Sequence, residues 1–125
     1  MNRTQLNIYK ERIIGSAHKV INTLGPTFEL PVYANALAHE LKKSGAAVSR
    51  EYAVPIYYDG VQVGRFCTDL LVEENILVNW THKPLSSQTQ KEHGYFQLAS
   101  ADLPMSMLLS LASGRLEVKT ITYKL

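Results

Sequence analysis

The sequence lacks most of the features that reveal a protein's task before its fold is known. Cys67 is its only cysteine, which excludes an internal disulfide framework and a zinc site built from several cysteines. No apolar run approaches the ~18–20 residues that a membrane span needs, and the polar start does not resemble a signal peptide. The net charge of +2 is far below that of a dedicated nucleic-acid binder. We therefore expect a cytoplasmic protein with no membrane partner.

What the chain does contain is a globular composition, with 46% apolar and 19% charged residues. Apolar residues recur at three- and four-residue steps over residues 6–24, which predicts a helix that Thr4 caps. A second helix is expected over residues 31–43, because Pro31 suits a first helical position and a glycine follows the last turn. The chain therefore begins with two amphipathic helices.

The period then changes to two. Asp59-Gly60 is a strong hairpin signal between two extended segments, and Pro55 places the first of them at a sheet edge or a bulge. A polar-to-amphipathic stretch at 86–101 predicts a helix between strands, which requires a parallel crossover. The result is an α/β domain with a mixed sheet, whose strands are expected at residues 51–58, 61–71, 76–80, 105–112 and 116–123.

Five polar residues are candidates for a site. Asp69 lies in an apolar strand, where a carboxylate needs a partner or a metal unless it faces solvent or caps a turn. Glu29 precedes the second helix, where an acid either interacts with the helix dipole or points into a cleft. Asn79, Thr81 and Lys83 alternate and share one strand face, unless the strand ends and they emerge into solvent. Asn79 stays close to the buried run and needs a hydrogen-bond partner.

The remaining polar and aromatic residues give weaker signals. The four histidines show no metal-ligand spacing, although His82 and His93 flank the expected crossover. Cys67 has only Arg65 as a basic neighbour, so we expect a buried, inert thiol. Tyr95-Phe96 is expected to contribute to the core.

Four segments carry a resemblance to a known family and together cover nearly the whole chain. They are IIGSAHKV at 13–20 with the turn LGP at 24–26, YANALAHEL at 33–41, VPIYYDGVQVG at 54–64 and DLLV at 69–72. In this order they resemble the GxxExxY family, a branch of the PD-(D/E)XK nuclease-like superfamily. The resemblance implies that residues 1–125 form a single domain with a restriction-endonuclease-like core, in which helices flank a mixed β-sheet.

The resemblance also implies a site around Asp69, which occupies the superfamily's metal-binding aspartate position. Such nucleases hold Mg²⁺ or Mn²⁺ between carboxylates and a backbone carbonyl, which is that of Trp80 here, while a lysine assists the reaction. The strand that carries an acid and a lysine in the family reads Asn79-Trp80-Thr81 in this chain. Leu30 stands where the family has its glutamate, and the position of a helical glutamine falls at about His93.

These departures weaken the metal chemistry that the family uses. Because Mg²⁺ prefers anionic oxygens, Asn79 removes one charge from the site, and Thr81 removes the cation that a lysine supplies. With Asp69 alone, metal affinity and rate should both collapse, so we expect no metal cofactor. A rewired site would draw its second carboxylate from Glu29 and its cation from Lys83, and it would then bind Mg²⁺ or Mn²⁺.

The sequence is compatible with three functions. The domain is expected to be a catalytically inactive nuclease-like module that acts by binding nucleic acid or protein. The first alternative is a residual or rewired metal-dependent nuclease that uses Asp69, Glu29, Lys83 and His82. The second is a protein-interaction scaffold without a nucleic-acid role, which the small net charge favours. The fold alone does not separate them.

Overall fold

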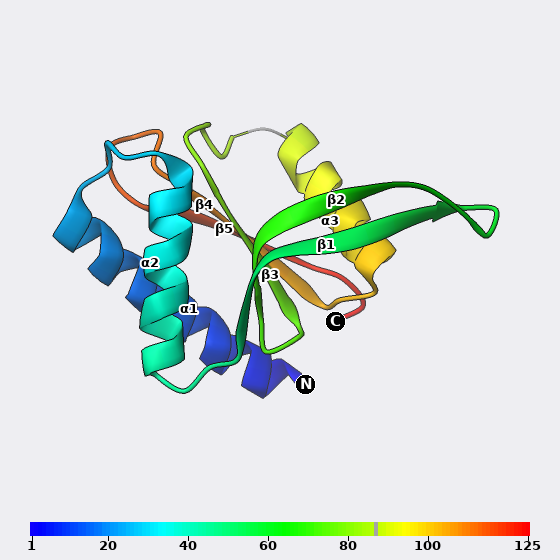
Figure 1. The fold of residues 1–125 in the computed structure, drawn as a ribbon, viewed down its shortest axis with the longest axis horizontal. Helices are drawn as coiled ribbons and strands as arrows, with labels where there is room; N and C mark the ends of the chain where they lie inside the picture. The colour runs from blue at the N-terminus through cyan, green and yellow to red at the C-terminus, as the bar shows by residue number, and fades with distance from the viewer. Residues whose placement is uncertain (87) are drawn as a thin grey trace.

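The computed structural model describes residues 1–86 and 88–125, which form one five-stranded sheet with three helices (Figure 1). The strands lie in the sheet in chain order, and all neighbours are antiparallel except β3 and β4, which are parallel. The elements are α1 (Arg3–Leu24), α2 (Leu30–Lys43), β1 (Val48–Tyr58), β2 (Val61–Val72), β3 (Ile76–Thr81), α3 (Gln88–Ala101), β4 (Met105–Ser110) and β5 (Glu117–Thr122).

This architecture confirms the mixed α/β sheet predicted from the sequence, including the crossover helix between the two parallel strands. Helices α1 and α2 lie on one side of the sheet and α3 lies on the other (Figure 1). The result is a sheet covered on both faces, consistent with a restriction-endonuclease-like core.

Alternation along β2 and β3 divides the apolar residues between two cores. The larger core packs under α1 and α2 and includes Leu70, Val78 and Trp80. The smaller core packs under α3 and includes Leu71 and Leu77. Since successive strand residues point to opposite faces, the near-continuous apolar run of β3 supplies both cores at once.

The hairpin prediction is confirmed in detail. Asp59 and Gly60 both have positive φ values, of 53° and 77°, as a two-residue turn of the primed type requires. Pro55 lies in β1, which is an edge strand of the sheet, and the β1–β2 register shifts between Ile56 and Tyr57. The hairpin extends well beyond the body of the domain (Figure 1).

Several local predictions were wrong. Asn2 rather than Thr4 caps α1, because the Asn2 side chain accepts the Gln5 N–H at 2.8 Å while Gln5 Oε1 accepts the Asn2 N–H at 2.9 Å. Tyr95 and Phe96 are 44% and 66% exposed rather than part of the core, since α3 buries only a narrow stripe on the sheet. Helix α3 begins at Gln88 rather than at residue 86, and residue 87 lies outside the described part of the chain. Among the helices described, none is long and apolar enough to cross a bilayer.

One buried tyrosine connects the helical layer to the sheet. The Tyr33 hydroxyl donates to the carbonyl of Gly25 at 2.5 Å and accepts the Phe28 N–H at 2.9 Å, so it closes the turn between α1 and α2. The ring of Tyr33 is fully buried and lies 5.5 Å from the ring of Trp80 on β3. Tyr33 therefore holds the start of α2 against the strand that carries the candidate site.

We expect Tyr33→Phe to lower the free energy of unfolding by about 1–3 kcal/mol, because the variant leaves two backbone groups of the turn without their partner. Urea denaturation measures this change. Tyr9→Phe is the matched control, since no hydrogen bond of the Tyr9 hydroxyl is found among the described residues, and it should change stability by less than about 0.5 kcal/mol. Equal stabilities for the two variants would contradict the role given to the Tyr33 hydroxyl.

Candidate functional site

The candidate site lies where the ladder between β2 and β3 ends. The two strands pair as far as Leu70 and Val78. One step further, Asn79 Oδ1 accepts the Asp69 N–H and Asp69 Oδ2 accepts the Trp80 N–H, both at 2.8 Å. Hydrogen bonds from these side chains thus continue the connection between the strands beyond the backbone ladder. Both Asp69 and Asn79 are half-buried.

Asp69 is also held from the opposite strand. The Arg50 guanidinium donates to the Asp69 carbonyl oxygen and, through Nε, to Asn35 Oδ1 on α2 at 2.9 Å. Glu51 lies between Arg50 and Tyr52, which pair with Leu70 and Thr68, and it has a φ of 53°, a left-handed conformation that is uncommon for a non-glycine residue. The backbone at Asp69 is therefore constrained from both sides.

The Trp80 carbonyl, which the sequence analysis proposed as a metal ligand, lies on the β2 edge of β3. In an extended strand the N–H and C=O of one residue point to the same side, and the Trp80 N–H points to Asp69. The carbonyl and the Asp69 carboxylate thus occupy the same gap between strands. The Trp80 ring is buried on the other face, where its indole N–H has no acceptor among the described residues.

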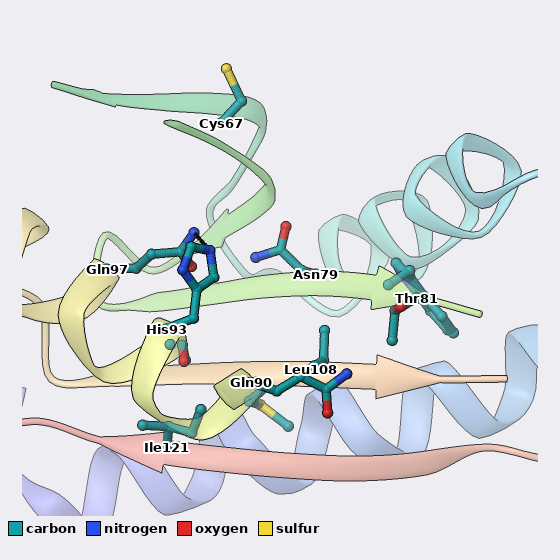
Figure 2. Close-up of a pocket in the computed structure, with 12 residues that line it drawn as sticks. Cys67, Asn79, Thr81, Gln90, His93, Gln97, Leu108 and Ile121 are labelled. Atoms are coloured by element: carbon teal, nitrogen blue, oxygen red, sulfur yellow. Dashed lines mark hydrogen bonds between the residues drawn. The ribbon is translucent and has the colours of Figure 1, made fainter. Parts of the chain in front are cut away.

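A cavity of about 260 Å³ opens beside this gap, between α3 and the sheet (Figure 2). Asn79 and Thr81 line it from β3, and His93 and Gln97 line it from α3, where they hydrogen-bond to each other at 3.0 Å. Helix α3 lies close to the sheet at Gly94, because a Cβ there would come within 2.4 Å of Ile121 Cδ1.

Cys67 also lines this cavity and is exposed, so the expectation of a buried thiol was wrong. The physical reason is the length of β2. This strand continues past the end of its pairing with β3 into the projecting hairpin, and its residues there are no longer covered by a neighbouring strand on that side.

The two residues proposed as substitutes lie at the ends of their elements and are exposed. Glu29 is the N-cap residue of α2 and is exposed, and its carboxylate makes no hydrogen bond or ion pair with the residues described. Leu30, one position further, packs against the larger core. Lys83 is exposed past the end of β3, where its N–H donates to Thr81 Oγ1 at 3.0 Å and its carbonyl accepts the Ser110 hydroxyl at 2.6 Å. Their part in a site stays a prediction.

The donors gathered around Asp69 fit Mg²⁺ poorly. Mg²⁺ takes oxygen ligands, several of them anionic, in near-octahedral geometry. Asp69 offers one carboxylate, with one oxygen already accepting the Trp80 N–H, and the Asn79 oxygen is neutral and also occupied. Within residues 1–86 and 88–125 no group of three His, Cys, Asp or Glu side chains is placed to hold a metal. The side chains around Asp69 therefore lack the anionic ligands that a Mg²⁺ site requires.

The comparisons with known proteins agree with this fold. The family model of the PD-(D/E)XK nuclease superfamily matches residues 7–121, so the chain belongs to that superfamily. Nucleases of this superfamily generally use Mg²⁺ or Mn²⁺. No curated protein and no solved structure matches the chain. The narrower assignment to the GxxExxY family stays a prediction.

Three residues that sequence reasoning missed take part in this region. Arg50 holds the Asp69 carbonyl, while Gln97 and Ser106 line the cavity. Two of them left a readable signal. Gln97 lies four residues after His93 and hence on the same helical face, and Ser106 is a single polar residue within an apolar strand. Arg50 left none, because its contact joins residues of β1 and β2 that are 19 positions apart in the sequence.

Restoring the family's charged groups should restore metal binding. We expect Asn79→Glu with Thr81→Lys to bind Mg²⁺ or Mn²⁺ measurably, because two carboxylates then meet beside the Trp80 carbonyl. Cleavage should stay slight, since Leu30 still occupies the glutamate position. Without metal the new charges should cost roughly 1–3 kcal/mol of stability, and Mn²⁺ should recover part of it, which thermal melts with and without Mn²⁺ measure.

The matched control is Asn79→Gln with Thr81→Lys, which has the same side-chain length but no added carboxylate. Its melting temperature should not respond to Mn²⁺. If the Glu variant is equally unresponsive, the gap between β2 and β3 no longer forms a metal pocket.

Proposed function

We propose that this domain binds nucleic acid with a nuclease-like fold and does not cleave it. One observation carries the proposal. The Asp69 carboxylate accepts a backbone N–H of β3, and the Asn79 amide accepts a backbone N–H of β2. In a nuclease of this superfamily, the side chains at these two positions would bind a metal ion instead. The Asp69 carboxylate joins β2 to β3 by accepting the Trp80 N–H. Asn79 is uncharged, so it adds no second negative charge beside this hydrogen bond.

The charge distribution supports modest, electrostatically assisted binding. Lys83 and His82 are exposed beside the end of β3, and neither side chain forms an ion pair with a described residue. Cations at that position can contact phosphate groups of a strand lying over the sheet edge. With a net charge of +2, the domain should make few phosphate contacts, so affinity should fall only gently with salt.

A protein partner is the second candidate, and the projecting hairpin favours it. Tyr57, Tyr58, Val61 and Val63 are between 62% and 75% exposed at its tip. Contiguous exposed apolar side chains of this kind mark interaction surfaces. This role leaves the cavity under α3 unused, so a hairpin variant such as Tyr58→Ser separates it from the first proposal.

We expect the purified protein to bind a single-stranded oligonucleotide equally well in Mg²⁺ and in EDTA, measured by fluorescence anisotropy, because no metal takes part. In the same buffers, with Mg²⁺ or Mn²⁺, it should not cut single- or double-stranded DNA or RNA above background.

Asp69→Asn is the control variant, since an amide oxygen can still accept the Trp80 N–H while the charge is gone. It should bind as the parent does. Metal-dependent cleavage that is lost in Asp69→Asn would establish a working nuclease instead. Failure to bind any nucleic acid, together with capture of a protein partner that Tyr58→Ser abolishes, would favour the second candidate.

A further inference from the structure

A serine hydroxyl without a protein partner among the described residues opens into the cavity between α3 and the sheet. Ser106 on β4 is only 7% exposed and lines the cavity, yet its hydroxyl makes no hydrogen bond with any residue in the described part of the chain. It lies near Gly94 and Ile121, where α3 crosses the sheet. This hydroxyl can therefore donate to, or accept from, a ligand or a water in the cavity.

A second hydrogen-bonding group faces the same space. Because Asn79 Oδ1 accepts the Asp69 N–H, its Nδ2 must point the other way, and Figure 2 shows it turned toward His93 and Gln97. Gln97 Nε2 and His93 Nε2 lie 3.0 Å apart in a hydrogen bond, so an amide and an imidazole also border this space. The cavity thus offers several hydrogen-bond donors and acceptors.

The rest of the lining is apolar or uncharged. Leu108 and Ile121 supply the hydrophobic walls, and among the described lining residues none carries a carboxylate, an ammonium or a guanidinium group. A phosphate group or a metal ion would gain little here, because both need charged partners. A planar, neutral ring with hydrogen-bonding edges fits this chemistry.

We infer that the cavity holds a single unpaired nucleobase, which enters as a strand lies across the β2–β3 gap. This inference rests on the proposed nucleic-acid binding and names the part of the ligand that the domain reads. At about 260 Å³ the cavity falls below the roughly 300–1,000 Å³ of sites for drug-sized ligands, so one base ring is admitted and a base pair is not. Enzymes and binding modules that read extruded bases combine the same two elements, hydrogen bonds to the base edge and apolar walls.

The test compares strands that have equal numbers of phosphates but differ in their bases. Anisotropy is measured for labelled 12-mers of each base, in deoxyribose and ribose form, and for a 12-mer built only of abasic sugar-phosphate. We expect at least one base to bind about tenfold more tightly than the abasic strand. The deoxy and ribo series distinguish DNA from RNA as the source of the base.

Ser106→Ala should weaken binding of the preferred strand by about 3- to 10-fold and leave the abasic strand unaffected, since one hydrogen bond to the base is lost. Ser100→Ala, at an exposed position of α3, is the matched control and should bind as the parent does. Titration of the ¹⁵N-labelled protein with the free nucleosides should shift the Asn79, Gln97 and Ser106 amide signals.

The outcomes separate the two proposals. Equal affinity for base-containing and abasic strands overturns the base pocket while nucleic-acid binding stands. A second outcome is binding that depends on the base while Ser106→Ala leaves it unchanged and no cavity signal shifts. This result overturns the base pocket as well and assigns the base to another surface. No binding of any strand removes the proposed function, and the base pocket with it.

Discussion

The pairing of Asp69 with Asn79 and Trp80 keeps β2 and β3 together after their backbone ladder has ended. Without it, β2 would leave the sheet one residue earlier as it turns outward into the long hairpin. A carboxylate that accepts a buried backbone N–H contributes about 1.5–3 kcal/mol, more than a neutral pair. This local pairing therefore positions the hairpin, the Trp80 ring and the mouth of the cavity together.

The two faces of the sheet are packed differently, and this difference creates the cavity. Under α1 and α2 the core is large and closed, and Tyr33 holds the helical layer against Trp80. Under α3 only Gly94 and Leu98 are buried on the helix, so its contact with the sheet is confined to one side. The remaining space lies next to Asn79 and Thr81. The cavity is therefore lined by uncharged side chains on the face of the sheet that α3 covers.

The residues at positions 79 and 81 both form hydrogen bonds within the protein. An acid at position 79 would place a second negative charge beside the half-buried Asp69, and without a metal the two charges would repel. Asn79 relieves the repulsion and still accepts the Asp69 N–H. Thr81 accepts the Lys83 N–H where a lysine would seek an anion. Both side chains thus have hydrogen-bond partners within the protein itself.

The sequence by itself determined the elements whose signals are local. The Asp59-Gly60 turn, the apolar run of β3 and the crossover between β3 and β4 follow from turn chemistry, period and chain length, and the position of Asp69 on a strand followed from the same patterns. The resemblance to the nuclease superfamily carried the fold. A local signal gave a wrong prediction where a second residue could fill the same role. Asn2, together with Gln5, caps α1 in place of Thr4.

Only the tertiary structure decided which residues meet. No pattern along the chain shows that the Asp69 carboxylate accepts the Trp80 N–H, that Arg50 reaches across a strand to the Asp69 carbonyl, or that the Ser106 hydroxyl is left without a partner in the cavity. Cys67 and Phe96 are exposed because no neighbouring element covers them, which is also a property of the tertiary structure. Burial and hydrogen bonding between distant residues depend on strand register and helix placement, and a sequence read locally contains neither.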